Sequence, residues 1–366
     1  MAQRQFRSDD TSLWIDKFGY GSDGDYAPST GDDAPIDSAC TGTINTTSLS
    51  ATNASFAIGQ LILIHQTQGT GAGQWELNKI ANYSAGTITT AYPLIFGYVT
   101  GAQVLVMSQH SSGNIATGQT ISAKLWNGTV GGIYAKFFNG TFTYEGTLLL
   151  NGKGFRGGLG STGAGGNPAQ AGESEIGGVV KQSANNGSGG GGGNDTTPAG
   201  TGGTTNGSTN LVTILFGGGG GGNGNSGGGA APGGGIGFIF AKNIIQSGSG
   251  SSDVGGGITA AGGGGGGGGS LLMKCETATL GTNKITSIGG TGGNSGTGAG
   301  GGGGGAATSG SNGSPGAPGT AGSGGNGRIH IDYALSLSGS TSPALDSTQD
   351  ISLLSSGTMT TNTKKW

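Results

Sequence analysis

Side chains that could perform catalysis are scarce in this sequence of 366 residues. The three histidines are His65, His110 and His330. His65 follows Ile64, and His330 lies between two further isoleucines. Apolar neighbours of this kind indicate β-strands, from which we expect each imidazole to point outward. No HExxH, GxSxG or Cys–His pattern accompanies them, so the sequence predicts neither a zinc site nor an activated nucleophile.

The carboxylates give no better indication of catalysis. Glycoside hydrolysis needs two close carboxylates, and Glu173 and Glu175 flank a single residue in the glycine-rich half. They could share a strand face, but we expect solvated loop charges. Eight aspartates precede residue 40, yet they lack the spacing and distal glutamate of a calcium loop, so we expect a solvated acidic arm. We therefore predict no enzymatic activity, no metal and no cofactor.

The turns between glycine tracts are the expected binding positions, because loops on a rigid scaffold concentrate function. Their amides, hydroxyls and carboxylate would suit hydrogen bonding to a polar glycan. The candidates lie in segments 194–210 and 308–314 and are Asn194, Asp195, Thr204, Asn206, Asn210 and Asn312. Aromatic residues could instead stack on sugars, but their place in apolar strands favours core packing. They are Trp75, Trp126, Tyr83, Tyr92, Tyr134 and Tyr144.

Glycine determines the class of protein, because 90 of the 366 residues are glycine, whereas proteins average about 7%. We favour extended polyglycine II helices of three residues per turn, packed so that neighbouring chains satisfy one another's backbone groups. Mobile Gly/Ser loops are the main alternative. Disorder of the whole half is disfavoured because apolar stretches alternate with the tracts and only 9% of residues are charged. No GxxxxGK[ST] motif supports a phosphate-binding loop.

Short apolar runs divided by turn residues predict an all-β fold. We expect a small N-terminal β-barrel or sandwich, followed by stacked β-strands with packed polyglycine II helices and Gly-rich loops. Units that begin near residues 131, 235, 269 and 325 open with glycine and continue into alternating strands, which must stack to bury their apolar faces. The expected divisions are a polar arm (1–40), the barrel (41–112), a strand unit (113–158), the glycine-rich scaffold (159–335) and a tail (336–366).

Charge and hydropathy exclude several partners. A net charge of −3 argues against nucleic-acid binding, and no stretch of about 18 apolar residues predicts membrane insertion. The start, MAQRQFRSDD, has no apolar h-region, so no signal peptide is visible. A virion protein, released by lysis, needs none, although a truncated chain or another export route would look the same. Cys40 and Cys275 match no metal-site spacing, and we favour free thiols over a disulfide between them.

Glycine tracts interleaved with short apolar strands and diverse turns resemble the glycine-rich distal tail-fibre adhesins of tailed bacteriophages. The tracts that carry the resemblance are 189–193, 217–222, 262–269 and 300–305, within residues 155–327. The resemblance implies an N-terminal attachment domain and a sandwich of polyglycine helices whose tip loops recognise a receptor. The strands here are longer than in that family, and the N-terminal barrel has no counterpart. The pattern is also similar to glycine-rich bacterial surface proteins.

We therefore expect a virion-associated fibre or tip protein on the virion or extracellular surface. Its partners would be a host surface glycan or outer-membrane protein, and other virion or fibre proteins through the N-terminal part. Open strand edges favour a homo-oligomer, with a trimer expected. Two other functions fit the sequence: a purely structural filament, sheath or decoration subunit, and an ice-binding protein with a flat polyglycine surface. Depolymerisation of the receptor is a further open alternative.

Overall fold

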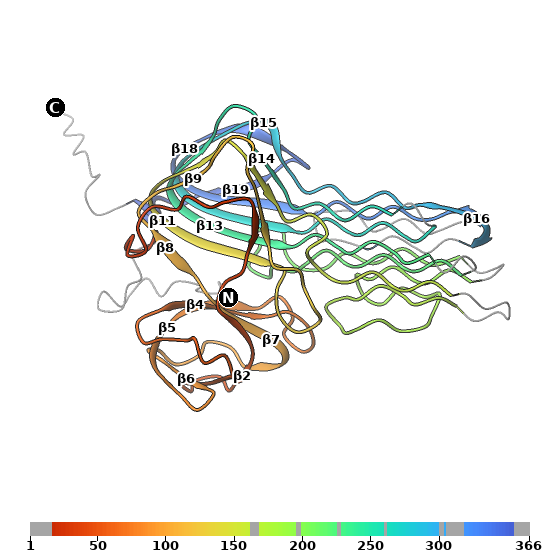
Figure 1. The fold of residues 1–366 in the computed structure, drawn as a ribbon, viewed down its shortest axis with the longest axis horizontal. Helices are drawn as coiled ribbons and strands as arrows, with labels where there is room; N and C mark the ends of the chain where they lie inside the picture. Colours follow the sequence, from red (N-terminus) through yellow and green to blue (C-terminus); the bar gives the residue numbers. More distant parts are fainter. Residues whose placement is uncertain are drawn as a thin grey trace, which may run out of the picture.

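The structure is a computed structural model that describes residues 17–161, 168–194, 199–224, 228–259, 262–299, 304 and 318–354. Within these ranges the chain is all-β, as its sequence predicts, and its one helix is the 3-10 turn η1 (Ile351–Leu353). None of these residues belongs to a helix with the length and hydropathy that crossing a membrane would require. A barrel, a parallel sheet and an array of glycine-rich segments make up the molecule (Figure 1).

The barrel is closed by six antiparallel strands in the order β2-β3-β6-β5-β4-β7. These strands are β2 (Asp37–Gly42), β3 (Ser48–Ala51), β4 (Leu61–Gln66), β5 (Trp75–Ser84), β6 (Thr87–Thr90) and β7 (Tyr98–Val106). All six residues of β4 are buried, because Ile62 and Ile64 face the barrel core while Leu61 and Leu63 face the parallel sheet. The barrel begins at Asp37, four residues before the boundary expected from the sequence.

The parallel sheet stacks the repeated units that the sequence predicts. Its long strands are β11 (Ile133–Tyr144), β13 (Ile236–Gln246), β15 (Ser270–Thr286) and β18 (Arg328–Ser342). They align in one register, because Ile133 pairs with Ile236, Ile236 with Ser270, and Ser270 with Arg328. The coils of chain that contain these strands form a solenoid, and one face of each strand meets its interior. The other face of β11 and β13 packs on the barrel through Phe137, Phe238 and neighbouring residues.

Shorter strands form a second parallel row, so that the chain winds in coils. The row consists of β10 (Thr120–Ala123), β12 (Thr147–Leu149), β14 (Ser251–Asp253) and the end of β15, with Ile121, Leu148, Ser252 and Ile285 in register. The first coil also contains β8 (Ser108–His110) and β9 (Gly113–Ile115), which pair with β11. One hydrophobic core fills the space between the two rows.

The N-terminal arm covers the first coil instead of standing free in solvent. Its strand β1 (Gly31–Asp33) pairs with β10. Asp23, Asp25 and Asp32 are exposed, as expected of an acidic arm in solvent, but the described part of the arm is paired to the first coil and does not stand free. Two of its aspartates form ion pairs with lysines of the body, Asp32 with Lys153 and Asp33 with Lys136, and Asp37 at the start of the barrel pairs with Lys124. These ion pairs fasten the arm to the solenoid.

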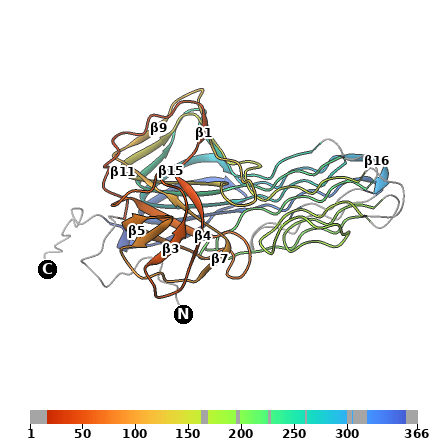
Figure 2. The ribbon, with the colours of Figure 1, turned by 60° about the horizontal axis from the view of Figure 1, so that its bottom comes forward.

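The glycine-rich segments leave the solenoid between its coils. They follow β12, β14 and β15, and they return to begin β13, β15 and β18. Side by side they form an elongated array that extends to the right in Figure 1 and away from the barrel in both views (Figure 2). The pair β16 (Asn294–Ala299) and β17 (Pro318–Thr320) lies at its far end (Figure 1). At the opposite side, β18 continues to Ser342 and pairs with β19 (Asp346–Gln349), within the segment expected to be a tail.

Candidate functional site: a polyglycine array and its base

The array has the hydrogen-bond pattern of packed polyglycine II helices. Residues 262–269 lie at its centre, and their amides point to three neighbouring segments in rotation, as three residues per turn requires. Gly264 and Gly267 donate to Gly221 and Gly218, Gly265 and Gly268 to Gly322 and Gly325, and Gly266 and Gly269 to Gly257 and Val254. The donor–acceptor distances are 2.7–3.1 Å. Each helix therefore satisfies its backbone through its neighbours and not internally.

Close packing explains why the central helices contain glycine alone. A methyl group on Gly265 would overlap the carbonyl of Gly290, and one on Gly266 would overlap the carbonyl of Pro232. In the other central helix, residues 217–222, an added Cβ at every position would meet a backbone carbonyl from one of three neighbouring segments. None of the glycines at 217–222 and 263–269 has a positive φ, so glycine is required there for space and not for backbone conformation.

Helices at the surface of the array carry other residues where one side faces solvent. Arg156 and Leu159 are three residues apart and both exposed, as are Ile288 and Thr291. This spacing matches one turn of the helix, so one position in three points outward. The purest glycine tracts accordingly mark the interior of the array.

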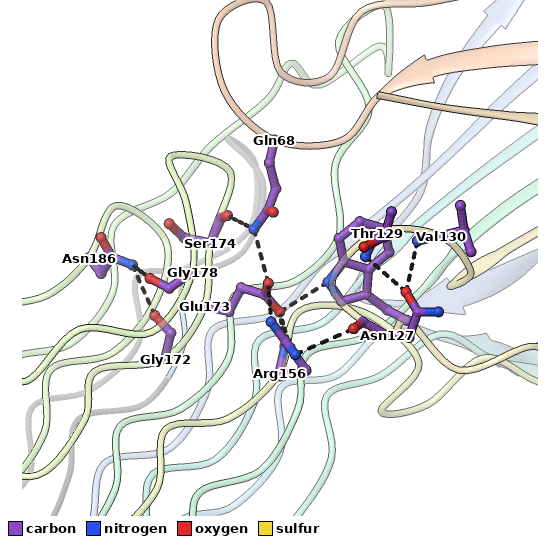
Figure 3. A network of polar contacts seen from close by, with 11 residues as sticks. Gln68, Asn127, Thr129, Val130, Arg156, Gly172, Glu173, Ser174, Gly178 and Asn186 are labelled. Atoms are coloured by element: carbon purple, nitrogen blue, oxygen red, sulfur yellow. Dashed lines mark hydrogen bonds and ion pairs between the residues drawn. The ribbon is translucent and has the colours of Figure 1, made fainter. Parts of the chain in front are cut away.

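At the base of the array, Glu173 joins its first helices to the barrel and the sheet (Figure 3). Its carboxylate accepts hydrogen bonds from the Arg156 side chain (Nε and Nη2, 3.0 Å each), from Trp126 Nε1 (3.0 Å) and from Gln68 Nε2 (3.2 Å). Glu173 is 1% exposed, so the expectation of a solvated loop charge is wrong. Its hydrogen bonds raise the pKa of the Arg156 guanidinium above its ordinary value.

Glu175 extends the same junction, although it is only partly buried. Its backbone carbonyl accepts from Gly69 of the barrel (2.8 Å), and its carboxylate accepts from Asn206 Nδ2 (2.9 Å). Glu173 and Glu175 thus hold separate contacts, Glu173 with Arg156 and Glu175 with Asn206. Sequence analysis missed this junction; the available signal was the rarity of charged residues among the glycine tracts, which makes each one a candidate for a structural contact.

A second junction fastens residues 211–215 to the barrel. His65 Nε2 lies 2.9 Å from the carbonyl of Ile214, and its Nδ1 lies 2.9 Å from Thr67 Oγ1. Trp75 Nε1 donates to the carbonyl of Leu211 at 3.3 Å. Burial, partly offset by the hydrogen bond to Ile214, lowers the pKa of His65 to about 4, so its ring is neutral at pH 7. The two junctions together fix the array relative to the barrel.

The outward orientation expected for the histidines is also wrong. His65, His110 and His330 are 0%, 9% and 2% exposed. His330 lies between two carboxylates, with Asp332 Oδ1 at 3.0 Å and Asp346 Oδ2 at 2.8 Å. Each ring is buried by a different neighbour: His65 by residues 211–215, His110 by the rings of Tyr26 and Phe138, and His330 by the strand β19.

The candidate binding residues are dispersed. Asp195 and Asn312 lie outside the described residues. Asn194 and Asn206 are each 8% exposed, whereas Thr204 and Asn210 are exposed. Asn206 lies at the base and not at a tip, because its carbonyl accepts from Arg328 at the start of β18 (3.0 Å). Residues 199–210 run back toward the barrel, so the prediction of one turn over 194–210 is wrong for its described part.

The far ends of several helices gather in one place. The amide of Ser161 donates to the carbonyl of Asn223 (2.8 Å), and a methyl group on Gly224 would overlap Asn194. Thr259 donates its amide to Thr291 (3.3 Å) and its hydroxyl to the carbonyl of Gly229 (3.2 Å). Six segments of the described chain therefore lie beside one another toward the far end of the array.

Other sequence candidates have structural roles in the described part of the chain. Trp75, Trp126, Tyr134 and Tyr144 are at most 1% exposed, which confirms core packing for these four, while Tyr83 and Tyr92 are partly buried. Cys40 and Cys275 are free thiols buried in separate cores. The described residues contain no group of three histidine, cysteine or acidic side chains suited to hold a metal ion.

No protein-family model matches this chain, and no curated protein shows significant similarity to it.

Proposed function

We propose that this chain is a non-enzymatic fibre or tip protein of a virion, which binds a receptor on a host surface through the far end of its polyglycine array. The observation that carries the proposal is the array itself: a body of hydrogen-bonded backbone that is fastened at one end to a folded barrel, with several described segments lying together toward its far end. Loops held by such a body are suited to recognition.

The chemistry of the connecting segments favours a neutral polar receptor surface. The chain passes between described helices through 162–167, 195–198, 225–227, 260–261 and 305–317, in which Asp195 is the only charged residue and no aromatic residue occurs. Asn, Ser and Thr supply hydrogen-bond donors and acceptors. A neutral glycan or the loops of an outer-membrane protein would suit these groups better than a phosphate-rich surface, which requires Arg or Lys.

Cell binding by the labelled full-length chain tests the proposal. We expect saturable binding to some bacterial strains of a panel. Replacement of residues 195–198 by glycine and serine should reduce that binding, whereas the same replacement in the barrel turn 44–47 should not. Saturable binding that survives replacement of all five segments would contradict a far-end site, and failure to bind any strain would favour a structural subunit. Regular filaments or sheaths seen by electron microscopy would identify that second function.

A further inference from the structure

The N-terminal arm is anchored at both ends of its described part and only lightly held between them. Phe18 is buried in the core between the barrel and the sheet, and Asp37 begins β2 of the barrel. Most of residues 20–35 are exposed. Their strand pairing is short, since it consists of β1 with β10 and a single bridge between Tyr26 and Gly113. A span with few buried contacts between two anchors can open locally while the rest of the fold stays intact.

His110 lies beneath the middle of this span. Its ring packs against Tyr26 of the arm, with 4.9 Å between ring centroids, and stacks on Phe138 of β11 at 5.7 Å. Nδ1 of His110 lies 3.3 Å from the carbonyl of Gly24, which also accepts from the amide of Ser111 at 2.9 Å. His110 is 9% exposed, so the arm supplies part of its cover.

The partners of the two ring nitrogens favour a neutral imidazole. Because a carbonyl can only accept, Nδ1 carries the proton and Nε2 is left as an acceptor. Nε2 lies 3.0 Å from Ser108 Oγ, and the same oxygen accepts from Lys136 Nζ at 2.9 Å. The Ser108 hydroxyl therefore accepts from Lys136 and donates to His110. A proton on Nε2 would point a second donor at Ser108 and would place a positive charge near the Lys136 ammonium.

The titratable and charged groups around the ring are Tyr26, Asp23, Asp25 and Asp33 from the arm and Lys136 from β11. Burial and then the Lys136 charge lower the pKa of His110 from 6.5. The hydrogen bond to Gly24 and the charges of Asp23 and Asp33 oppose this shift without cancelling it.

Lifting the arm would reverse the largest of these effects. The ring would gain solvent, and Lys136, which pairs with Asp33 of β1 at 2.8 Å, could turn toward water. The arm would also remove Asp23 and Asp33, but burial is the larger cause. The open form therefore binds a proton more readily than the closed form, and acid favours opening.

We propose that His110 makes residues 19–36 of the arm an acid-released strap, which lifts from the first coil when the ring gains a proton at mildly acidic pH. The step is proton binding alone, and both anchors of the strap stay in place. Lifting uncovers the edges of β10 and of Gly113 that the arm pairs at neutral pH, and such edges can accept another strand. The inference does not depend on receptor binding by the array.

Amide hydrogen exchange of the full-length chain, corrected for the intrinsic effect of pH on exchange, tests the strap. The reporting amides are those of Asp23, Tyr26, Ser111 and Asn114, which bond across the junction at 2.8–3.0 Å. Their protection should fall by about tenfold between about pH 7.5 and about pH 5, while β13 and β15 stay protected. Unchanged protection of the four amides over this range would overturn the proposal.

His110→Gln separates the histidine from the carboxylates. Glutamine stays neutral, so the strap of this variant should lose no protection as pH falls, whatever its protection at neutral pH. His330→Gln is the matched control, because it removes another buried histidine and should leave the acid response of the strap unchanged. An equal acid response in His110→Gln and the unmodified chain would contradict the proposal.

An NMR titration of the His110 ring in the unmodified chain decides the question if His110→Gln fails to fold. The ring should gain its proton over the same pH range in which the strap amides lose protection. Loss of protection that begins only below about pH 4.5, where aspartates titrate, would assign opening to Asp23, Asp25 and Asp33 and would overturn the role of His110.

Discussion

The backbone amide of Gly265 donates a 2.9 Å hydrogen bond to the carbonyl of Gly322, and the amide of Gly268 donates to Gly325 at 2.8 Å. A step of three residues in both segments fits two parallel helices with three residues per turn. The intervening amides of Gly266 and Gly267 point to other neighbours. The array is therefore ordered by backbone hydrogen bonds in several directions, and its stability depends on how closely the chains approach.

Gly265→Ala should destabilise the protein by about 1–3 kcal/mol, because the new methyl group would overlap the carbonyl of Gly290 and force the helices apart. The midpoint of denaturant unfolding measures this change. Gly178→Ala is the matched control, since its Cβ would meet no atom within 4 Å and its φ is not positive; it should be neutral or slightly stabilising. Equal stability of the two variants would argue against close packing of the array.

Glu173→Gln should cost about 3 kcal/mol of unfolding free energy, because an amide nitrogen would face the donors of Trp126 and Arg156 in a buried site. Arg156→Met should cost less, since the Arg156 side chain is 49% exposed and Trp126 and Gln68 would still reach the carboxylate. Thermal or chemical unfolding compares the two variants. A larger loss in Arg156→Met would show that the guanidinium, not the carboxylate, organises the junction.

Glu76 should make the barrel less stable as pH rises. Burial raises its pKa from 4.5 to about 7, against the lowering effect of hydrogen bonds from the Ile95 and Phe96 amides. Between these values the unfolded chain has lost the proton that the folded chain keeps, so unfolding free energy falls by an amount on the order of 3 kcal/mol as pH rises. Glu76→Gln should remove this slope. A slope that persists in the variant would assign it to another group.

His65 should have the opposite effect. Its folded pKa of about 4 lies below its ordinary value of 6.5, so the unfolded chain binds the extra proton between these values. The contribution of His65 to the unfolding free energy is fully present above pH 6.5. It is lost as pH falls toward 4, by an amount on the order of 3 kcal/mol. His65→Gln should flatten the acid side of the stability profile relative to the unmodified protein. If the variant and the unmodified protein lost stability equally on the acid side, the folded protein would protonate the His65 ring as readily as the unfolded chain does.

Local sequence signals predicted the elements better than their contacts. The alternating strands after Gly132, Gly235, Gly269 and Gly327 were visible because glycine stops just before apolar residues begin, and their stacking follows from apolar faces that need cover. Tracts of pure glycine indicated interior polyglycine helices, because any side chain there would meet a neighbouring carbonyl.

Contacts between distant parts could not be predicted in this way. Glu173 reads as a loop charge until the fold brings Gln68, Trp126 and Arg156 around it. The sequence around Asn206 predicts a turn at a tip. In the structure this segment returns to the base of the array, where Asn206 contacts Glu175 and Arg328. The direction of each glycine segment depends on its hydrogen-bonded neighbours, and segments of nearly identical sequence carry no signal for which neighbour each one meets.

Amide hydrogen exchange of residues 217–222 and 262–269 tests the central claim most directly. If these glycines form interior helices of a packed array, their amides are hydrogen-bonded to neighbouring segments and should exchange as slowly as those of β13 and β15. Gly265→Ala should accelerate exchange in both segments. Exchange at the rate of a free glycine chain, with β13 and β15 still protected, would contradict the array and leave a barrel and solenoid with flexible glycine loops.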